Sequence, residues 1–192
     1  MIRMLYEWTI LLAGHPRALW ALALIAFIES SVFPIPPDAL LIPMIIAKPR
    51  KTWLYAVVAT VFSVLGGLLG YVIGAVAFEQ VGKPILEALG KSDAVNEFSV
   101  RFNNVGFWTV LMAGITPFPF KVITIMSGAT AMPLGVFLPT AIIARGLRFF
   151  VVATLLQVFG ATIKSFIERY LSWLFFALLI LLFGGFLMVG YL

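Results

Sequence analysis

The stretch Ser30–Leu40, SSVFPIPPDAL, interrupts an apolar segment with three prolines and an aspartate. Proline has no backbone N–H and its ring clashes with the preceding turn, so Pro34, Pro36 and Pro37 cannot all lie within one continuous helix. Each proline also pushes the residue before it towards an extended conformation. The sequence therefore predicts that the chain breaks here, with a separate short helix on either side.

The composition indicates that this break belongs to a membrane protein. Of 192 residues, 62% are hydrophobic and 11% are charged, which is too little charge to cover the surface of a soluble domain. We therefore expect an all-α polytopic membrane protein that forms a single membrane domain over residues 1–192. Cysteine is absent, and the single histidine, His15, precedes a proline, so the sequence predicts no catalytic residue, no metal site and no cofactor.

The apolar segments on either side of the break are too short to cross a bilayer. Residues 17–32 and 39–47 each fall below the roughly 20 residues that a transmembrane helix needs. Irregular backbone at membrane depth persists only where protein or water covers it. We therefore expect the two segments to form a re-entrant hairpin, followed by a full-length span over residues 52–78.

The same arrangement recurs in the second half of the chain. The pattern Pro34-Ile-Pro36-Pro37-Asp38 matches Pro117-Phe-Pro119-Phe120-Lys121 at an offset of 83 residues. Short apolar segments flank the second break, and a long span follows at residues 136–160. Such a recurrence is typical of internal duplication. The expected parts are repeat 1 (about 16–78), an amphipathic connection (79–104), repeat 2 (about 105–163) and a C-terminal span (171–192).

Positive charges in the short loops predict the orientation of the chain. Arg3, Arg17, Lys48, Arg50 and Lys51 all lie before or beside the first hairpin. Arginine and lysine accumulate on the cytoplasmic side, so we place the N-terminus in the cytoplasm and the C-terminus outside. The second repeat then enters from the opposite side, and the two broken tips meet near the midplane. Inverted repeats with discontinuous helices at their interface are typical of transporters.

Ionisable side chains fall within the apolar segments, where each charge costs about 2.5–3.5 kcal/mol on insertion scales. They are Glu29, Asp38, Lys121, Arg145 and Arg148. If the tips converge, two carboxylates and three cations share one wet cavity, and its net positive charge suits an anionic group such as a phosphate. Two simpler interpretations stay open. The charges only pair to hold the hairpins, with exchange of Asp38 and Lys121 as the test, or Asp38 only caps a helix.

Glycines recur every four residues in the first span, at Gly66, Gly70 and Gly74, and so lie on one helix face. Small residues at this spacing let two helices approach closely, so we interpret the three glycines as helix-packing residues. They do not form a nucleotide-binding loop, because no strand precedes them and no Lys-Ser or Lys-Thr pair follows.

Four segments of the chain together resemble a known family. ESSVFPIPPDALL, GLLGYVIG, FNNVGFWTVLMAGITPFPFK and RGLRFF are similar, in order and spacing, to the DedA family of SNARE-associated or VTT-domain membrane proteins, specifically its short YqaA-like branch. The resemblance covers about residues 16–165. It implies two inverted re-entrant hairpins in the plasma (inner) membrane and movement of lipids between leaflets. The implied cargo is undecaprenyl phosphate or a phospholipid, with proton or sodium coupling in some members.

The resemblance also implies roles for individual residues. Glu29 and Asp38 resemble the two essential membrane acids of the family, which implies proton or ion coupling. Lys121 stands where the larger branch has the second arginine of its Arg-x-x-Pro-x-x-Arg motif, whereas the first arginine falls on Ile115. The acid that often follows the glycine in the first span is Leu68 here. We expect two arginines of the second span to replace the missing positive charge, so the candidate substrate-binding residues are Lys121, Arg145 and Arg148.

The sequence thus favours a transporter that moves an anionic lipid between leaflets. Membrane lipids with phosphate headgroups are the expected partners, nucleic acid is not expected, and homo-oligomerisation stays open. One alternative is a small-ion or solute transporter of the same architecture. Another is a membrane assembly or homeostasis factor that transports nothing, in which charge pairs only hold the hairpins together. An intramembrane phosphatase ranks below both, because no histidine or serine cluster offers a phosphoryl acceptor.

Overall fold

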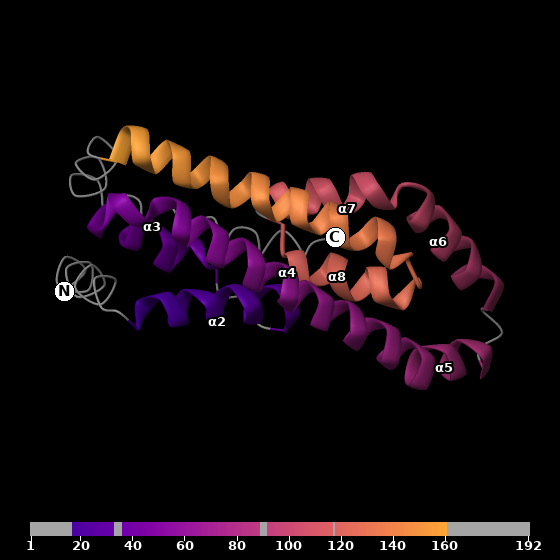
Figure 1. Cartoon of the computed structure of the whole chain (residues 1–192). Coiled ribbons are helices and arrows are strands. Elements are labelled where there is room, and N and C mark those ends of the chain that lie inside the picture. Colours follow the sequence, from indigo (N-terminus) through magenta and orange to yellow (C-terminus); the bar gives the residue numbers. More distant parts are fainter. Residues whose placement is uncertain (1–16, 33–35, 89–91, 117, 161–192) are drawn as a thin grey trace, which may run out of the picture.

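The computed structural model of the chain describes residues 17–32, 36–88, 92–116 and 118–160. Every regular element in these ranges is helical, which confirms the all-α class (Figure 1). The expected C-terminal span over residues 171–192 lies outside the described residues, as do Pro34 and Pro117 of the two breaks.

The first half of the chain forms a short antiparallel helix pair and a long helix. α2 (Ala18–Ser31) runs towards the first break, and α3 (Asp38–Ala47) returns from it (Figure 1). The 3₁₀ turn η1 (Pro49–Lys51) then leads into α4 (Thr52–Ala77), which extends along both helix pairs. The break lies where the prolines predict it, and Pro37 directly precedes α3 with helical backbone angles.

The connection between the halves is helical as well. α4 continues without a break into the π-helical turn η2 (Phe78–Gly82) and α5 (Lys83–Ala88), and α6 (Ser92–Asn104) follows. Glu79 and Lys83 form an exposed ion pair one turn apart, with Nζ and Oε2 separated by 3.5 Å. The polar segment expected at 79–104 therefore begins as an extension of the first long helix.

The second half repeats the arrangement of the first with the opposite direction. α7 (Gly106–Ile115) runs towards the second break, α8 (Phe120–Ala129) returns from it, and the helix Leu134–Gly160 runs back along the molecule. In Figure 1 the ends of α2 and α3 that lie away from their break are near the start of α4. The ends of α7 and α8 that lie away from their break are near the end of α4.

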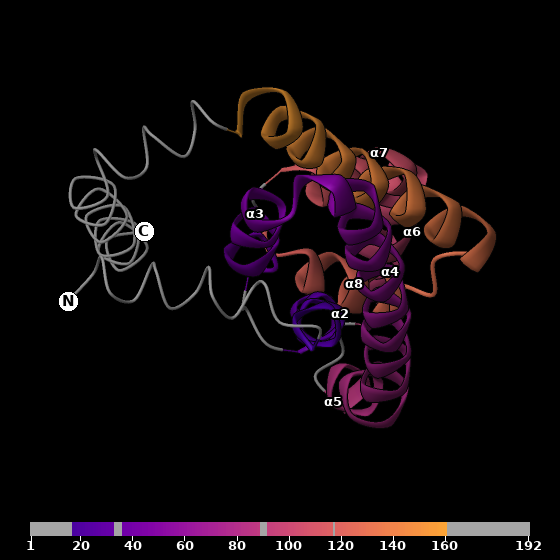
Figure 2. The same ribbon diagram turned by 60° about the vertical axis from the view of Figure 1, so that its left-hand side comes forward.

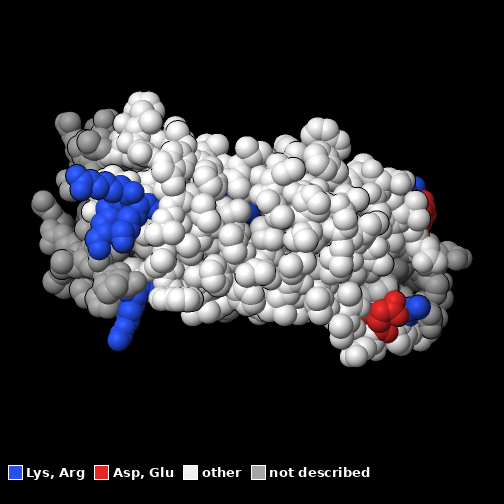
Figure 3. Space-filling view, viewed as in Figure 1, with Lys and Arg blue, Asp and Glu red and all other residues white. Residues whose placement is uncertain are grey.

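Two helices in the described ranges are long and apolar enough to cross a membrane. They are Pro49–Leu86, which includes α4, and Leu134–Gly160. The helices of the two pairs are apolar but each has fewer than 18 residues. Figure 3 shows charged side chains at the two ends of the molecule and an almost uncharged band between them. This distribution is typical of a membrane-embedded helical protein.

α4 packs against both helix pairs through what we call the glycine face, formed by Gly66, Gly70 and Gly74. A Cβ atom added at Gly66 would overlap the backbone of Phe27 in α2, and one at Gly74 would overlap the backbone of Ile125 in α8. Contacts between helix backbones at this separation require residues without side chains. The glycine face therefore holds one helix of each pair directly against α4.

Buried residues form two apolar clusters with a polar layer between them. The first cluster joins α2, α3 and α4 to the second half of the Leu134–Gly160 helix, where Phe149 is fully buried. The second joins α7 and α8 to the first half of that helix, where Phe137 is fully buried. The buried polar residues include Glu29, Ser30, Ser63, Thr124 and Arg145.

We expect Gly74→Ala to lower the free energy of unfolding in detergent by about 1–3 kcal/mol, the usual range for overpacking. The added methyl group would overlap the backbone of Ile125, which cannot rotate away as a side chain can. Gly135→Ala is the matched control, because nothing lies within 4 Å of a Cβ atom at that position. Thermal unfolding provides the measurement, and equal midpoints for the two variants would contradict the close packing.

Candidate functional site

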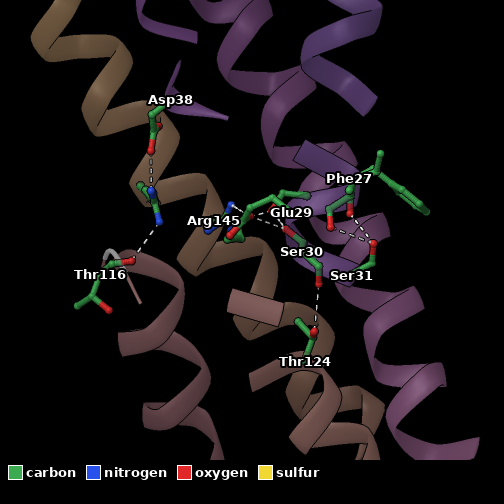
Figure 4. A network of polar contacts seen from close by, with 11 residues as sticks. Phe27, Glu29, Ser30, Ser31, Asp38, Thr116, Thr124 and Arg145 are labelled. Atoms are coloured by element: carbon green, nitrogen blue, oxygen red, sulfur yellow. Dashed lines mark hydrogen bonds and ion pairs between the residues drawn. The ribbon is translucent and has the colours of Figure 1, made fainter. Parts of the chain in front are cut away.

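The structure brings the predicted charges into one layer between the two breaks, and Figure 4 shows Glu29, Asp38 and Arg145 in it. Glu29 lies near the end of α2 and Asp38 at the start of α3, while Lys121 lies at the start of α8. Arg145 and Arg148 lie on the Leu134–Gly160 helix. They contact Glu29 and Asp38, which are 116 and 110 residues away in the sequence. Their assigned roles in coupling and substrate binding stay predictions.

Arg145 occupies the most buried position in this layer, with 0% of its side chain exposed. Its Nη2 donates to Glu29 Oε2 at 2.7 Å, and its Nε donates to Ser63 Oγ at 2.6 Å. The guanidinium lies between the rings of Phe120 and Phe149, 4.9 and 4.7 Å from their centroids. A buried charge is tolerated only when it is paired and hydrogen-bonded, and these contacts meet that condition.

Two serines close a ring of hydrogen bonds around this pair. Ser30 Oγ donates to Glu29 Oε2 at 3.0 Å and lies 2.6 Å from Ser63 Oγ. A carboxylate only accepts, so Ser63 donates to Ser30 while it accepts from Arg145. Thr124 Oγ1 in α8 donates to the carbonyl of Ser30 at 3.1 Å. One connected network therefore joins α2, α4, α8 and the Leu134–Gly160 helix.

Ser63 and Thr124 were not among the predicted site residues. Each is a hydroxyl-bearing residue within an apolar helix, and such residues commonly bond to a carbonyl of their own helix. Thr60, one turn before Ser63, does so through the carbonyl of Ala56. The sequence alone therefore could not show that Ser63 bonds to Arg145 while Thr60 bonds to its own helix.

Arg148 and Asp38 form a second ion pair nearer to the surface of the layer. Arg148 Nη2 lies 2.6 Å from Asp38 Oδ2, and the two side chains are 15% and 23% exposed. Arg148 Nη1 also donates to the carbonyl of Thr116, the C-cap residue of α7, at 3.1 Å. Asp38 makes no capping hydrogen bond, so its carboxylate serves Arg148 instead of the start of α3. Its ion-pair partner is therefore Arg148 and not Lys121.

Lys121 differs from the two arginines because it forms no ion pair with a carboxylate in the described part of the chain. Its Nζ donates to the carbonyl of Val32, the C-cap residue of α2, at 3.1 Å. A cation at this position is stabilised by the partial negative charge at a helix C-terminus. Lys121 on the second helix pair therefore caps a helix of the first pair, while Arg148 caps α7.

A cavity of about 160 Å³ lies where the two breaks meet. Its polar lining consists of Glu29, Lys121 and Arg148, and its apolar lining comes from Pro36, Pro37, Phe118 and Pro119. A second cavity, of about 360 Å³, lies near the end of α8 beside η2 and α6, and none of the charges of the layer line it. Within the described residues, no three His, Asp or Glu side chains gather that could hold a metal ion.

Buried polar atoms without a partner also occur in this layer. Asp38 Oδ1 and Arg145 Nη1 make no hydrogen bond within the described residues. Such atoms are uncommon in folded proteins and need an explanation when they occur. The two ion pairs therefore leave one acceptor, Asp38 Oδ1, and one donor group, Arg145 Nη1, without a hydrogen bond in the described residues.

Comparison with known proteins gives the family of the chain. A family model described as the VTT domain matches residues 35–158, which include the second break, most of the first, and four of the five charges of the layer. The chain belongs to the VTT-domain family. Membership of this membrane-protein family and the two long apolar helices together indicate a membrane protein.

Two relatives extend the match over most of the chain. A protein of Haemophilus influenzae, described only as uncharacterized, is 34% identical over 168 residues, which cover 85% of this VTT-domain protein and 87% of the relative. A similarly described protein of Histophilus somni is 34% identical over 173 residues, covering 88% and 90% of the two chains. No solved structure matches. The relatives therefore support the family without adding a substrate.

We expect Arg145→Leu to lower the free energy of unfolding by about 3–5 kcal/mol, because it leaves the Glu29 carboxylate buried without its partner. Combining it with Glu29→Gln should recover part of this loss. Lys83→Ala, which removes one partner of the exposed pair with Glu79, is the matched control and should change stability little. Thermal unfolding in detergent measures all three, and an Arg145→Leu midpoint equal to that of the control would disprove the role of the pair.

Proposed function

We propose that this VTT-domain protein moves a lipid with an anionic phosphate headgroup between the two leaflets of the plasma (inner) membrane. The observation that carries the proposal is Lys121, a cation without a carboxylate partner in the described ranges, at a cavity lined by both breaks. With two carboxylates against three cations, the layer has a net positive charge that an anion would neutralise.

The ends of the short helices support an anion at this place. α3 and α8 each begin at a break, and the residues that precede them, Pro37 and Pro119, line the cavity. Helix N-termini carry free N–H groups and a partial positive charge, which favour phosphate. The Lys121 ammonium supplies the uncompensated charge, and Arg148, which is paired with Asp38, adds N–H donors at the cavity wall. The fully buried Arg145 positions Glu29.

In this proposal the helix pairs α2–α3 and α7–α8 are re-entrant hairpins that enter the membrane from opposite sides. Support comes from their length, since all four helices are too short to span, and from their opposite direction along α4 (Figures 1 and 2). Opening the cavity to each leaflet in turn would move the headgroup across the membrane. Glu29 and Asp38 are the groups proposed to take up the coupling proton or ion, because they are the two carboxylates of the layer.

A membrane assembly factor that transports nothing is the second candidate. It is favoured by the two ion pairs, each of which is complete within the described residues, as a purely structural role requires. No observation favours a solute transporter of the same architecture. An assay of lipid and solute movement distinguishes the lipid transporter, the solute transporter and the assembly factor.

We expect Glu29→Gln and Asp38→Asn to abolish lipid movement, because an amide of similar size cannot bind a proton. Glu29→Gln also leaves the buried Arg145 guanidinium without a carboxylate, so its unfolding midpoint should fall, and transport is compared for the protein that remains folded. Transport by the unaltered protein should depend on pH between about 5.5 and 8.5, and the amide variants should lose that dependence. Purified protein in vesicles, with headgroup accessibility as readout and thermal unfolding as a check on folding, provides the measurement. Glu97→Gln, in an exposed pair with Arg101, is the matched control.

Two outcomes would contradict this proposal. Amide variants that transport at the unaltered rate with the same pH profile would leave the two acids as structural partners only. Vesicles in which the unaltered protein moves no lipid above the protein-free level would favour the assembly factor.

The orientation gives a separate prediction. Exposed Arg50 and Lys51 lie at the end where α4 begins, whereas Glu97 lies in α6 beyond its other end. If positive charges face the cytoplasm, an impermeant thiol reagent applied to intact cells should label Glu97→Cys and leave Arg50→Cys unlabelled. Disrupted cells, in which both should react, are the control, and labelling of Arg50→Cys alone in intact cells would invert the topology.

A further inference from the structure

We infer that the cavity between the breaks selects a headgroup with a single negative charge, a phosphodiester, over a phosphomonoester, which carries nearly two. The inference rests on the proposed function and concerns the substrate class of that same site. It follows from which charges of the layer are already paired, from the helix ends around the cavity and from its apolar lining.

When both acids are ionised, the charges of the layer leave one unit of positive charge for a ligand. Glu29 is paired with Arg145 and Asp38 with Arg148, so each of these pairs is neutral. Lys121 bonds to a backbone carbonyl, which carries no full charge. The other elements packed against the layer contribute neutral groups, Ser63 from α4 and the Thr116 carbonyl at the end of α7. The break residues 33–35 and 117 are Phe, Pro, Ile and Pro, so they add no charge.

The helix ends at the breaks add no net charge. Each break joins the C-terminus of one short helix to the N-terminus of the next, α2 to α3 and α7 to α8. A helix carries about +0.5 charge at its N-terminus and about −0.5 at its C-terminus, so the four ends cancel in sum. The N-termini can orient an anion, but Lys121 remains the only uncompensated unit charge among the described residues of the layer.

The donors and the lining fit a diester. An ammonium group has three N–H donors, and one of those on Lys121 is used by the Val32 carbonyl, which leaves two. A phosphodiester presents two non-bridging oxygens that share one negative charge. The prolines and Phe118 on the other walls offer apolar contact to the ester carbons. The same walls penalise any charge that remains unneutralised.

A phosphomonoester should fit only when it is protonated. Its charge is about −1.5 to −2 at neutral pH because its second pKa is about 6, so the cavity would be left with excess negative charge. Below that pKa the monoester binds a proton and carries one charge, like the diester. The preference should therefore be largest at alkaline pH and should disappear on acidification.

The test uses the full-length protein in phosphatidylcholine vesicles with a trace of one fluorescent lipid. Phosphatidylglycerol is the diester and phosphatidate the monoester, with matched acyl chains and dithionite accessibility as the readout. We expect the diester to move about tenfold faster than the monoester at about pH 8, since one unneutralised charge in an apolar site costs at least that factor. At about pH 5.5, below the second pKa of the monoester, the two rates should agree within about twofold.

A charge variant and its control test the assignment to Lys121. Lys121→Gln makes the layer neutral, so movement of the diester should fall and the preference should be lost. Arg50→Gln removes the same charge from the exposed end of the molecule and should keep both the rate and the preference. Dimethyl phosphate and inorganic phosphate added to the buffer test water-soluble sources of the same chemistry. Stronger competition by dimethyl phosphate at alkaline pH supports the charge match, and the reverse order contradicts it.

The failures are distinguishable. Equal rates for the two lipids at alkaline pH, or a faster monoester, would overturn the selection for a single charge while leaving lipid movement established. Movement of neither lipid above protein-free vesicles would remove the proposed function and this inference together. A preference retained by Lys121→Gln would overturn the assignment to that side chain.

Discussion

Arg145 is the buried charge around which the helices are arranged, because every hydrogen bond it makes crosses from one helix to another. Glu29 and Ser63 hold its guanidinium from α2 and α4, and two aromatic rings cover its faces. Loss of Glu29 or Ser63 would leave a second buried N–H group of Arg145 unpaired beside Nη1, which would cost more than an ordinary contact contributes. The positions of α2, α4 and the Leu134–Gly160 helix relative to one another therefore depend on these contacts of Arg145.

Much of the fold could be predicted from the sequence, since the strongest constraints are local. Prolines cannot continue a helix, and a bilayer sets the length of a span, so the breaks and the long helices lie within a few residues of their expected positions. The convergence of the charges was expected from the inverted repeats, whose broken tips meet near the midplane. The polar connection was less predictable, because the helix continues from α4 into α5 through Gly82 and Pro84, residue types that usually end a helix.

The pairing within the site could not be predicted in the same way. Arg145 and Arg148 lie one turn apart on one helix, and both carboxylates are within reach of that face, so spacing alone permits either assignment. The matching positions of Asp38 and Lys121 suggested a pair that the structure does not contain. The hydrogen bond from Lys121 to the carbonyl of Val32 could not be predicted, because every residue has a backbone carbonyl and the sequence does not show which one accepts the bond. Depth and backbone position, which only packing determines, decided these contacts.

The glycine face has a mechanical consequence. Where the backbones of α2 and α8 meet that of α4, these helices cannot slide or rotate without a clash, so the three form one rigid body that contains parts of both repeats. The Leu134–Gly160 helix has a smaller buried share than the first long helix. It is held by its ion pairs to Glu29 in α2 and Asp38 in α3, and by Phe149 and Phe137 in the two apolar clusters. A displacement of that helix alone would therefore break both ion pairs at once and remove Phe149 and Phe137 from the two apolar clusters. The two halves of the chain would then act unequally, because the rigid body takes α2 and α4 from the first half and only α8 from the second.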